Sequence, residues 1–183
     1  MNQPPALPPL LTPQEMPSLA GLSVPAQFYL VVRQPAPLAG MPYPAETTPW
    51  SELYALGLRH VVSLHSRPGK PYNPFPLQVL SSVHLQDLYG GMLPDDQLWE
   101  SNLLGVVTKV AREALKLGEG VLVHCAGGIG RTGTVIGCLL SSLGWPPQTV
   151  IDYLDQLNQA RGHRGWPESP WQAEMVHTYA ATA

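Results

Sequence analysis

The chain contains only two cysteines, Cys125 and Cys138, among its 183 residues. This number excludes the disulfide framework that holds small secreted domains together and favours a reducing compartment, so we expect a cytoplasmic protein. The N-terminus also lacks the basic and then apolar order of a secretory signal peptide. Cys138 lies among apolar residues of a predicted helix, so we expect it in the core rather than as a redox partner of Cys125.

Charged residues are also few, at 13% of the chain, and the net charge is −3. Without a basic excess, the composition gives no indication of a nucleic-acid partner or of a membrane-surface protein. No apolar run approaches the roughly 18 residues of a membrane-spanning helix, so no membrane span is expected. Five histidines show no spacing typical of metal ligands, and no metal is expected; they are His60, His65, His84, His163 and His177. The length suits one domain, which we expect to be a monomer.

Proline, in contrast, is abundant near the N-terminus, with seven prolines in the first 25 residues. Such a segment favours extended conformations and forms arms or flexible connections. We therefore expect residues 1–26 to form a Pro-rich N-terminal arm, and residues 27–183 to form the single globular domain.

Within that domain, strands and helices are predicted to alternate. Strands are predicted at residues 28–32, 38–44 (a short edge strand running into a turn), 60–65, 83–86 and 121–123. Helices are predicted at residues 49–56, from an Asp95 cap to Gly118, at 131–143, from Pro146 onward, and from about Ser169 onward. This order predicts an α/β three-layer sandwich, with a central, largely parallel sheet of about four to five strands flanked by helices.

One segment carries the chemistry: Val121-Leu-Val-His-Cys-Ala-Gly-Gly-Ile-Gly-Arg-Thr-Gly133. A cysteine attacks as its thiolate, and the N–H groups of a glycine-rich turn at a helix N-terminus stabilise such an anion and bind phosphate oxygens. An arginine adds a permanent charge and a planar fork that holds two phosphate oxygens. The segment therefore predicts a nucleophile, Cys125, inside a phosphate site. The substrate-binding residues would be Ala126, Gly127, Gly128, Ile129, Gly130 and Arg131.

His124-Cys125, five further residues and then Arg131-Thr132-Gly133 resemble the signature of the cysteine-dependent protein tyrosine phosphatase superfamily, most closely its compact dual-specificity group. Weaker similarities follow in the same order at residues 38–44, 58–64 and 161–172, so that the resemblance covers about residues 27 to 181. It implies a phosphotyrosine phosphatase-like fold, a phosphatase domain over residues 27–183 and a cysteinyl-phosphate intermediate. It also implies that no cofactor is needed, and that the Thr132 hydroxyl helps the sulfur to leave.

The family also uses an aspartic acid, just after the strand that precedes the long helix, to protonate the leaving group. Asp87 occupies this place, and the glycines that follow would let its loop close over substrate. Asp95 and Asp96 are alternatives, although both also suit the cap of the next helix, and an acid other than an aspartate stays open. Gln172 matches a family glutamine that orients water, or is a polar residue of the last helix.

The sequence indicates the substrate less clearly than it indicates the reaction. Relatives that hydrolyse phosphoinositides often carry lysines inside the loop, and this loop has none. We therefore expect a phosphorylated protein or peptide substrate, with phosphotyrosine ahead of phosphoserine or phosphothreonine. Arg161 and Arg164 could bind a second anion, which keeps a phosphoinositide or inositol-phosphate phosphatase as the alternative. A catalytically weak phosphate-binding scaffold is the third possibility, and a lost Cys125 or Arg131 would indicate it; both are present.

Overall fold

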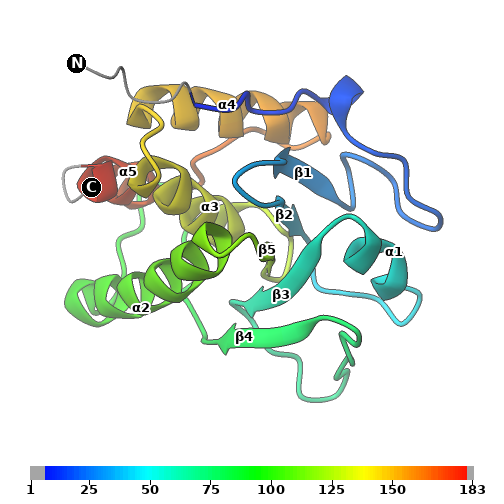
Figure 1. Ribbon diagram of the computed structural model, residues 1–183. Coiled ribbons are helices and arrows are strands. Elements are labelled where there is room, and N and C mark those ends of the chain that lie inside the picture. The colour runs from blue at the N-terminus through cyan, green and yellow to red at the C-terminus, as the bar shows by residue number, and fades with distance from the viewer. Residues whose placement is uncertain (1–6, 181–183) are drawn as a thin grey trace.

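A five-stranded sheet forms the centre of the molecule in the computed structural model, which describes residues 7–180 (Figure 1). The strand order is β1 (Tyr29–Val32), β2 (Leu38–Met41), β5 (Gly120–His124), β3 (Leu58–Ser63) and β4 (Gln78–Ser82). Only the β1–β2 pair is antiparallel, and the other three pairs are parallel. The predicted α/β sandwich with a largely parallel sheet is therefore confirmed.

Helices cover the two faces of the sheet unequally (Figure 1). The long helix α2 (Gln97–Lys116) and α3 (Gly130–Ser142) pack on one face, and α4 (Pro147–Ala160) and α5 (Pro170–Ala180) pack against α3 from outside. The short helix α1 (Trp50–Ala55) packs against β3 on the other face. Because α3 lies between the sheet and two helices, every one of its residues is buried, which explains its apolar sequence.

The strand predicted at residues 83–86 is wrong, because β4 forms five residues earlier. β4 is the outer strand of the sheet and is largely exposed, so its sequence lacks the continuous apolar run of a buried parallel strand. The backbone beyond it stays beside β3 without forming a regular ladder: Val83 N and Leu85 N donate to Ser63 O and Leu64 O at 2.9 and 3.3 Å.

The predicted edge position of residues 38–44 is also wrong. β2 lies between β1 and β5 because β1 folds back and covers its outer side. Pro42 and Pro44 are compatible with this inner position because both follow the last residue of the strand and remove no hydrogen bond from the ladder.

The helix predicted from Asp95 is confirmed as α2, but its cap is the next residue. Asp96 Oδ1 accepts a hydrogen bond from Trp99 N at 2.9 Å, which satisfies one of the free N–H groups of the first turn. Two apolar side chains of this helix, Leu98 and Val106, are exposed.

The described part of the N-terminal segment lies against the domain. Leu11 and Met16 are buried between the prolines, Leu11 N donates to Val31 O, and Leu11 O accepts from the Tyr153 hydroxyl, both at 2.8 Å. These contacts join the segment to β1 and α4, and Figure 1 shows it running along α4. Residues 1–6 lie outside the described part, and the domain boundary at residue 26 stays a prediction.

Candidate active site

Cys125 follows the last residue of β5 and begins a loop that ends in the first turn of α3; we call residues 125–131 the 125–131 loop. Its Sγ atom is buried and accepts a hydrogen bond from Gly128 N at 3.2 Å. Gly128 has a φ of +67°, and a Cβ at this position would lie 2.5 Å from the backbone carbon of Met41. Only glycine therefore lets the loop turn back over the sulfur.

The carbonyl groups of this loop are held from outside by other parts of the chain. Ala126 O accepts from Tyr43 N at 3.0 Å. Gly130 O accepts from Trp166 Nε1 at 3.3 Å and from the Thr134 hydroxyl at 2.8 Å. Because the N–H of a trans peptide points opposite to its carbonyl, an outward carbonyl turns the following N–H toward the interior of the loop. This is the orientation that binding of an anion requires.

The carbonyl of Gly128 has two such partners. The Tyr29 hydroxyl donates to it at 2.9 Å, and Arg161 Nη1 donates at 2.7 Å. Arg161 is buried with its guanidinium 4.3 Å from the centre of the Tyr29 ring, and it also donates to the carbonyls of Pro25 and Ala26. These contacts occupy its donors, so the structure does not support the expected role of Arg161 in binding a second anion.

Arg131 brings the candidate general acid to the loop. Its side chain is buried, its Nη1 atom lies 3.3 Å from Leu85 O and 3.4 Å from His65 Nδ1, and its Nε atom lies 3.3 Å from Asp87 Oδ1. The Asp87 carboxylate itself is largely exposed at the mouth of the site. Of the three aspartates considered from the sequence, Asp87 is the one paired with Arg131, whereas Asp96 caps α2.

Asp87 lies in a loop of residues 87–95. Gln86, the residue before this loop, connects its two ends and binds it to α2. The backbone N–H of Gln86 donates to Glu100 Oε1 at 2.6 Å, and its side-chain oxygen accepts from Asp95 N at 2.9 Å. In the middle, Met92 O accepts from the Ser169 hydroxyl at 2.6 Å. The residues between Asp87 and Pro94 therefore form a loop whose ends meet.

His124, the residue before the nucleophile, faces away from the loop interior. Its Nε2 atom lies 2.5 Å from the Tyr72 hydroxyl, and its Nδ1 atom 3.3 Å from Cys125 O. Burial lowers the pKa of His124 to about 4, so the ring is neutral at neutral pH. It therefore fixes the backbone at Cys125 without adding a charge beside the sulfur.

A second carboxylate, that of Glu168, lies at the site and was not found from the sequence. It sits directly against Gly130, where a side chain in place of the glycine hydrogen would clash with it. Burial and the negative charge of Asp87 raise the pKa of Glu168, while the N–H of Gly130 and the charge of Arg131 oppose that rise. Nothing in the local sequence indicates this position, because only the turn before α5 brings Glu168 to the loop.

The two remaining predicted residues are both buried at the loop. The side-chain oxygen of Gln172 accepts from Glu168 N at 2.8 Å and from Ser169 N at 3.2 Å, which leaves its amide nitrogen facing Gly130. The Thr132 hydroxyl has no hydrogen-bond partner among the described residues. Both stay candidates for the roles expected from the sequence.

Within residues 7–180, no three His, Cys, Asp or Glu side chains gather closely enough to hold a metal ion. Over the same residues, no helix combines the length and the apolar character that would let it cross a membrane.

Known proteins share this architecture. The human tyrosine phosphatase-like serine/threonine/tyrosine-interacting protein superposes with a TM-score of 0.58 at 16% identity, covering 79% of this chain and 91% of its own. Tk-PTP in its active form has a TM-score of 0.57 at 22% identity, with coverages of 80% and 92%. TpbA of P. aeruginosa, in complex with pTyr, has a TM-score of 0.52 at 19% identity, with coverages of 88% and 98%. At these identities the similarity shows a shared fold.

The sequence match is more specific. Residues 25–166, which include β1 to β5 and the whole 125–131 loop, match the family PTP-SAK, described as Swiss Army Knife protein, DSP-PTPase phosphatase domain. The match covers most of the chain and agrees with the resemblance carried by Cys125, Arg131 and Thr132. The chain therefore belongs to the PTP-SAK family of dual-specificity-type phosphatase domains.

Proposed function

We propose that this phosphatase acts on phosphorylated proteins, on phosphotyrosine and also on phosphoserine or phosphothreonine, through a cysteinyl-phosphate intermediate on Cys125. The observation that carries the proposal is the grouping of a buried sulfur, inward N–H groups and an Arg131–Asp87 ion pair around one small space. Such a group provides a nucleophile, charge stabilisation and an acid in one place.

In the first step, the Cys125 thiolate attacks phosphorus in line with the leaving oxygen. The S–P bond forms, the P–O bond to the leaving group breaks, and the leaving oxygen takes the proton of Asp87. Arg131 and the N–H groups of residues 126–131 hold the other three phosphate oxygens while charge is redistributed over them.

In the second step, water attacks the phosphoryl group on sulfur and gives a proton to the Asp87 carboxylate. The S–P bond breaks, phosphate leaves and the thiolate is restored, with the free hydroxyl of Thr132 available to stabilise the departing sulfur. The amide nitrogen of Gln172, which faces Gly130, is a candidate donor for orienting the attacking water.

Aromatic side chains beside the loop support phosphotyrosine as the first substrate. The ring of Tyr43 lies edge-on to those of His65 and Tyr72, with centroids 6.2 and 5.5 Å away. Tyr43 N donates to Ala126 O, and His65 lies beside Arg131, so an aromatic leaving group can pack edge to face against these two rings. The absence of lysine within the loop also favours a substrate with one phosphate over a polyphosphate.

Hydrolysis of p-nitrophenyl phosphate and of a phosphotyrosine peptide tests the nucleophile. We expect Cys125→Ser to lower kcat by about 10³-fold or more. The matched control is Cys138→Ser, which replaces the other buried cysteine, within α3, and should keep kcat close to that of the wild type. Undiminished turnover by Cys125→Ser would show that another residue attacks phosphorus.

The alternative substrates are phosphoinositides and inositol phosphates, for which Arg164 is the available cation beside the loop. A panel that compares phosphopeptides with these compounds at equal concentration separates the two, because the proposal requires the higher kcat/KM for phosphopeptides. A phosphate-binding scaffold would bind the peptide without turning it over. Measurable hydrolysis that depends on Cys125 excludes this third function.

A further inference from the structure

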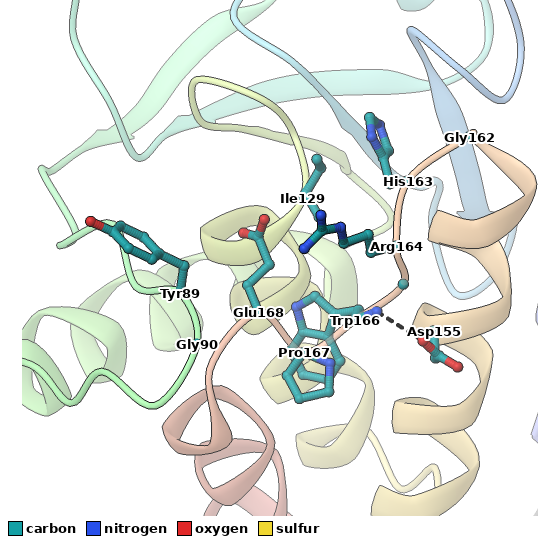
Figure 2. A pocket seen from close by; sticks show the side chains of 11 residues that line it. Tyr89, Gly90, Ile129, Asp155, Gly162, His163, Arg164, Trp166, Pro167 and Glu168 are labelled. Carbon is teal, nitrogen blue, oxygen red and sulfur yellow. Dashed lines mark hydrogen bonds between the residues drawn. The ribbon is translucent and has the colours of Figure 1, made fainter.

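A pocket of about 560 Å³ lies next to the 125–131 loop, between the 87–95 loop and the turn that joins α4 to α5 (Figure 2). It shares Ile129 with the loop and Glu168 with the candidate active site. A group attached to the phosphate of a bound substrate therefore has room to enter it. The pocket is lined by Tyr89, Gly90, Ile129, Asp155, Gly162, His163, Arg164, Gly165, Trp166, Pro167 and Glu168.

Arg164 points into this pocket, with its guanidinium directed toward Ile129 and Glu168 (Figure 2). Among the described residues it makes no hydrogen bond and no ion pair, and it is exposed. Arg161, three positions earlier, is buried and bound to four acceptors. Of the two arginines of this turn, Arg161 therefore holds the 125–131 loop, and Arg164 has free hydrogen-bond donors.

The other titratable groups that line the pocket carry no free positive charge. Both carboxylate oxygens of Asp155 accept hydrogen bonds, from Trp166 N at 2.9 Å and from Gln159 Nε2 at 2.8 Å. Burial and the charge of Arg161 lower the pKa of His163, so this ring is neutral at neutral pH. Burial raises the pKa of Glu168 and the N–H of Gly130 lowers it, and the carboxyl group lies against Gly130. Arg164 therefore supplies the free positive charge of the pocket.

We propose that this pocket binds an acidic side chain, Asp or Glu, next to the phosphorylated residue of a peptide substrate. The inference rests on the proposed protein phosphatase function. One free guanidinium matches one carboxylate, which it can hold through two parallel hydrogen bonds, whereas several phosphates would require several cations. The apolar walls formed by Ile129, Trp166 and Pro167 suit the methylene groups of such a side chain.

Four phosphotyrosine peptides test the proposal, with Glu or Gln placed either directly before or directly after the phosphotyrosine. For one of the two positions, we expect the Glu peptide to have a kcat/KM about fivefold higher than the Gln peptide, as an exposed charge pair allows. Arg164→Gln should abolish this preference through KM while keeping kcat for p-nitrophenyl phosphate. The preference should also weaken at high salt.

The matched control is Arg33→Gln, which removes the same charge from an exposed arginine at the far end of β1. This variant should retain the preference for Glu.

Equal kcat/KM for Glu and Gln peptides at both positions would overturn the proposal, and so would a preference that survives Arg164→Gln. A selective loss of inositol bisphosphate hydrolysis in Arg164→Gln, with peptides unaffected, would assign the pocket to a second phosphate instead. Failure of the wild type to hydrolyse p-nitrophenyl phosphate would contradict the phosphatase mechanism itself.

Discussion

Arg161 donates a 2.7 Å hydrogen bond to the carbonyl of Gly128, and so connects the turn after α4 to the loop that holds Cys125. The same arginine donates to the carbonyls of Pro25 and Ala26, in the segment that leads into β1. Three segments that are distant in the sequence therefore meet at the Arg161 guanidinium, which holds the Gly128–Ile129 peptide. Since this peptide also carries the N–H of Ile129, its orientation decides whether that N–H faces the phosphate.

Tyr29→Phe isolates this effect, because it removes one hydroxyl and keeps the ring that stacks on Arg161. Loss of one neutral hydrogen bond costs about 1 kcal/mol, so we expect the inhibition constant of inorganic phosphate to rise about fivefold. kcat/KM should fall by a similar factor. Steady-state kinetics with phosphate as a competitive inhibitor measures both.

Tyr153→Phe is the matched control for this prediction. Its hydroxyl also donates to a backbone carbonyl, that of Leu11, at 2.8 Å, but it lies at the N-terminal segment and not at the loop. The two variants should lose similar stability in thermal unfolding, and only Tyr29→Phe should bind phosphate more weakly. An equal loss of phosphate affinity in both would mean that the Tyr29 hydroxyl acts through overall stability.

The role of Asp87 depends on the leaving group. Without a proton donor, phosphotyrosine hydrolysis by Asp87→Asn should be slower by about 10²–10³-fold. The loss with p-nitrophenyl phosphate should be smaller, because nitrophenolate leaves without protonation. Asp95→Asn is the control, because it changes a nearby aspartate whose carboxylate is not paired with Arg131. This variant should hydrolyse phosphotyrosine with the wild-type kcat. If Asp95→Asn loses the activity and Asp87→Asn keeps it, the acid is misassigned.

Glu168 should make phosphate binding depend on pH. Its pKa is raised above the ordinary value of 4.5, mainly by burial, so it becomes a carboxylate only as the pH rises through that higher value. The carboxylate then competes with phosphate for the N–H of Gly130. We expect the ratio of the phosphate inhibition constants, wild type over Glu168→Gln, to increase as the pH rises above 4.5. A ratio independent of pH would contradict this competition.

Buried His124 should make the protein less stable in acid. Its folded pKa is about 4, against an ordinary 6.5, so between these values the unfolded chain binds a proton that the folded chain does not. The free energy of unfolding therefore falls as the pH drops from 6.5 to 4, by about 3 kcal/mol from this group, and is unaffected by it above 6.5. Urea unfolding at several pH values should show a flatter slope for His124→Gln. His177→Gln, an exposed histidine on α5, should keep the wild-type slope.

Much of the fold could be predicted because its elements carry local signals. The helix predicted at residues 131–143 is α3 (Gly130–Ser142), and the prolines at 146 and 147 and at 170 mark the starts of α4 and α5. The strand predicted at 83–86 failed because the exposed edge strand β4 has no continuous apolar run. The position of β2 in the sheet failed for another reason: strand order depends on which segment covers it, and no local pattern records that.

The sequence by itself predicted the candidate phosphate site, because Cys125, the glycines and Arg131 lie within seven consecutive residues and their spacing is enough to form a loop around an anion. It also indicated Asp87 as the candidate acid, because this residue follows directly on the segment beside β3, but it left Asp95 and Asp96 as alternatives. Only the tertiary structure decided which residues surround this loop. Tyr29 reaches it from β1, which lies beside β2, and Arg161 and Glu168 reach it from the turn between α4 and α5, which pack on α3. Such long-range contacts depend on the shape of the whole core, which no short stretch of sequence specifies.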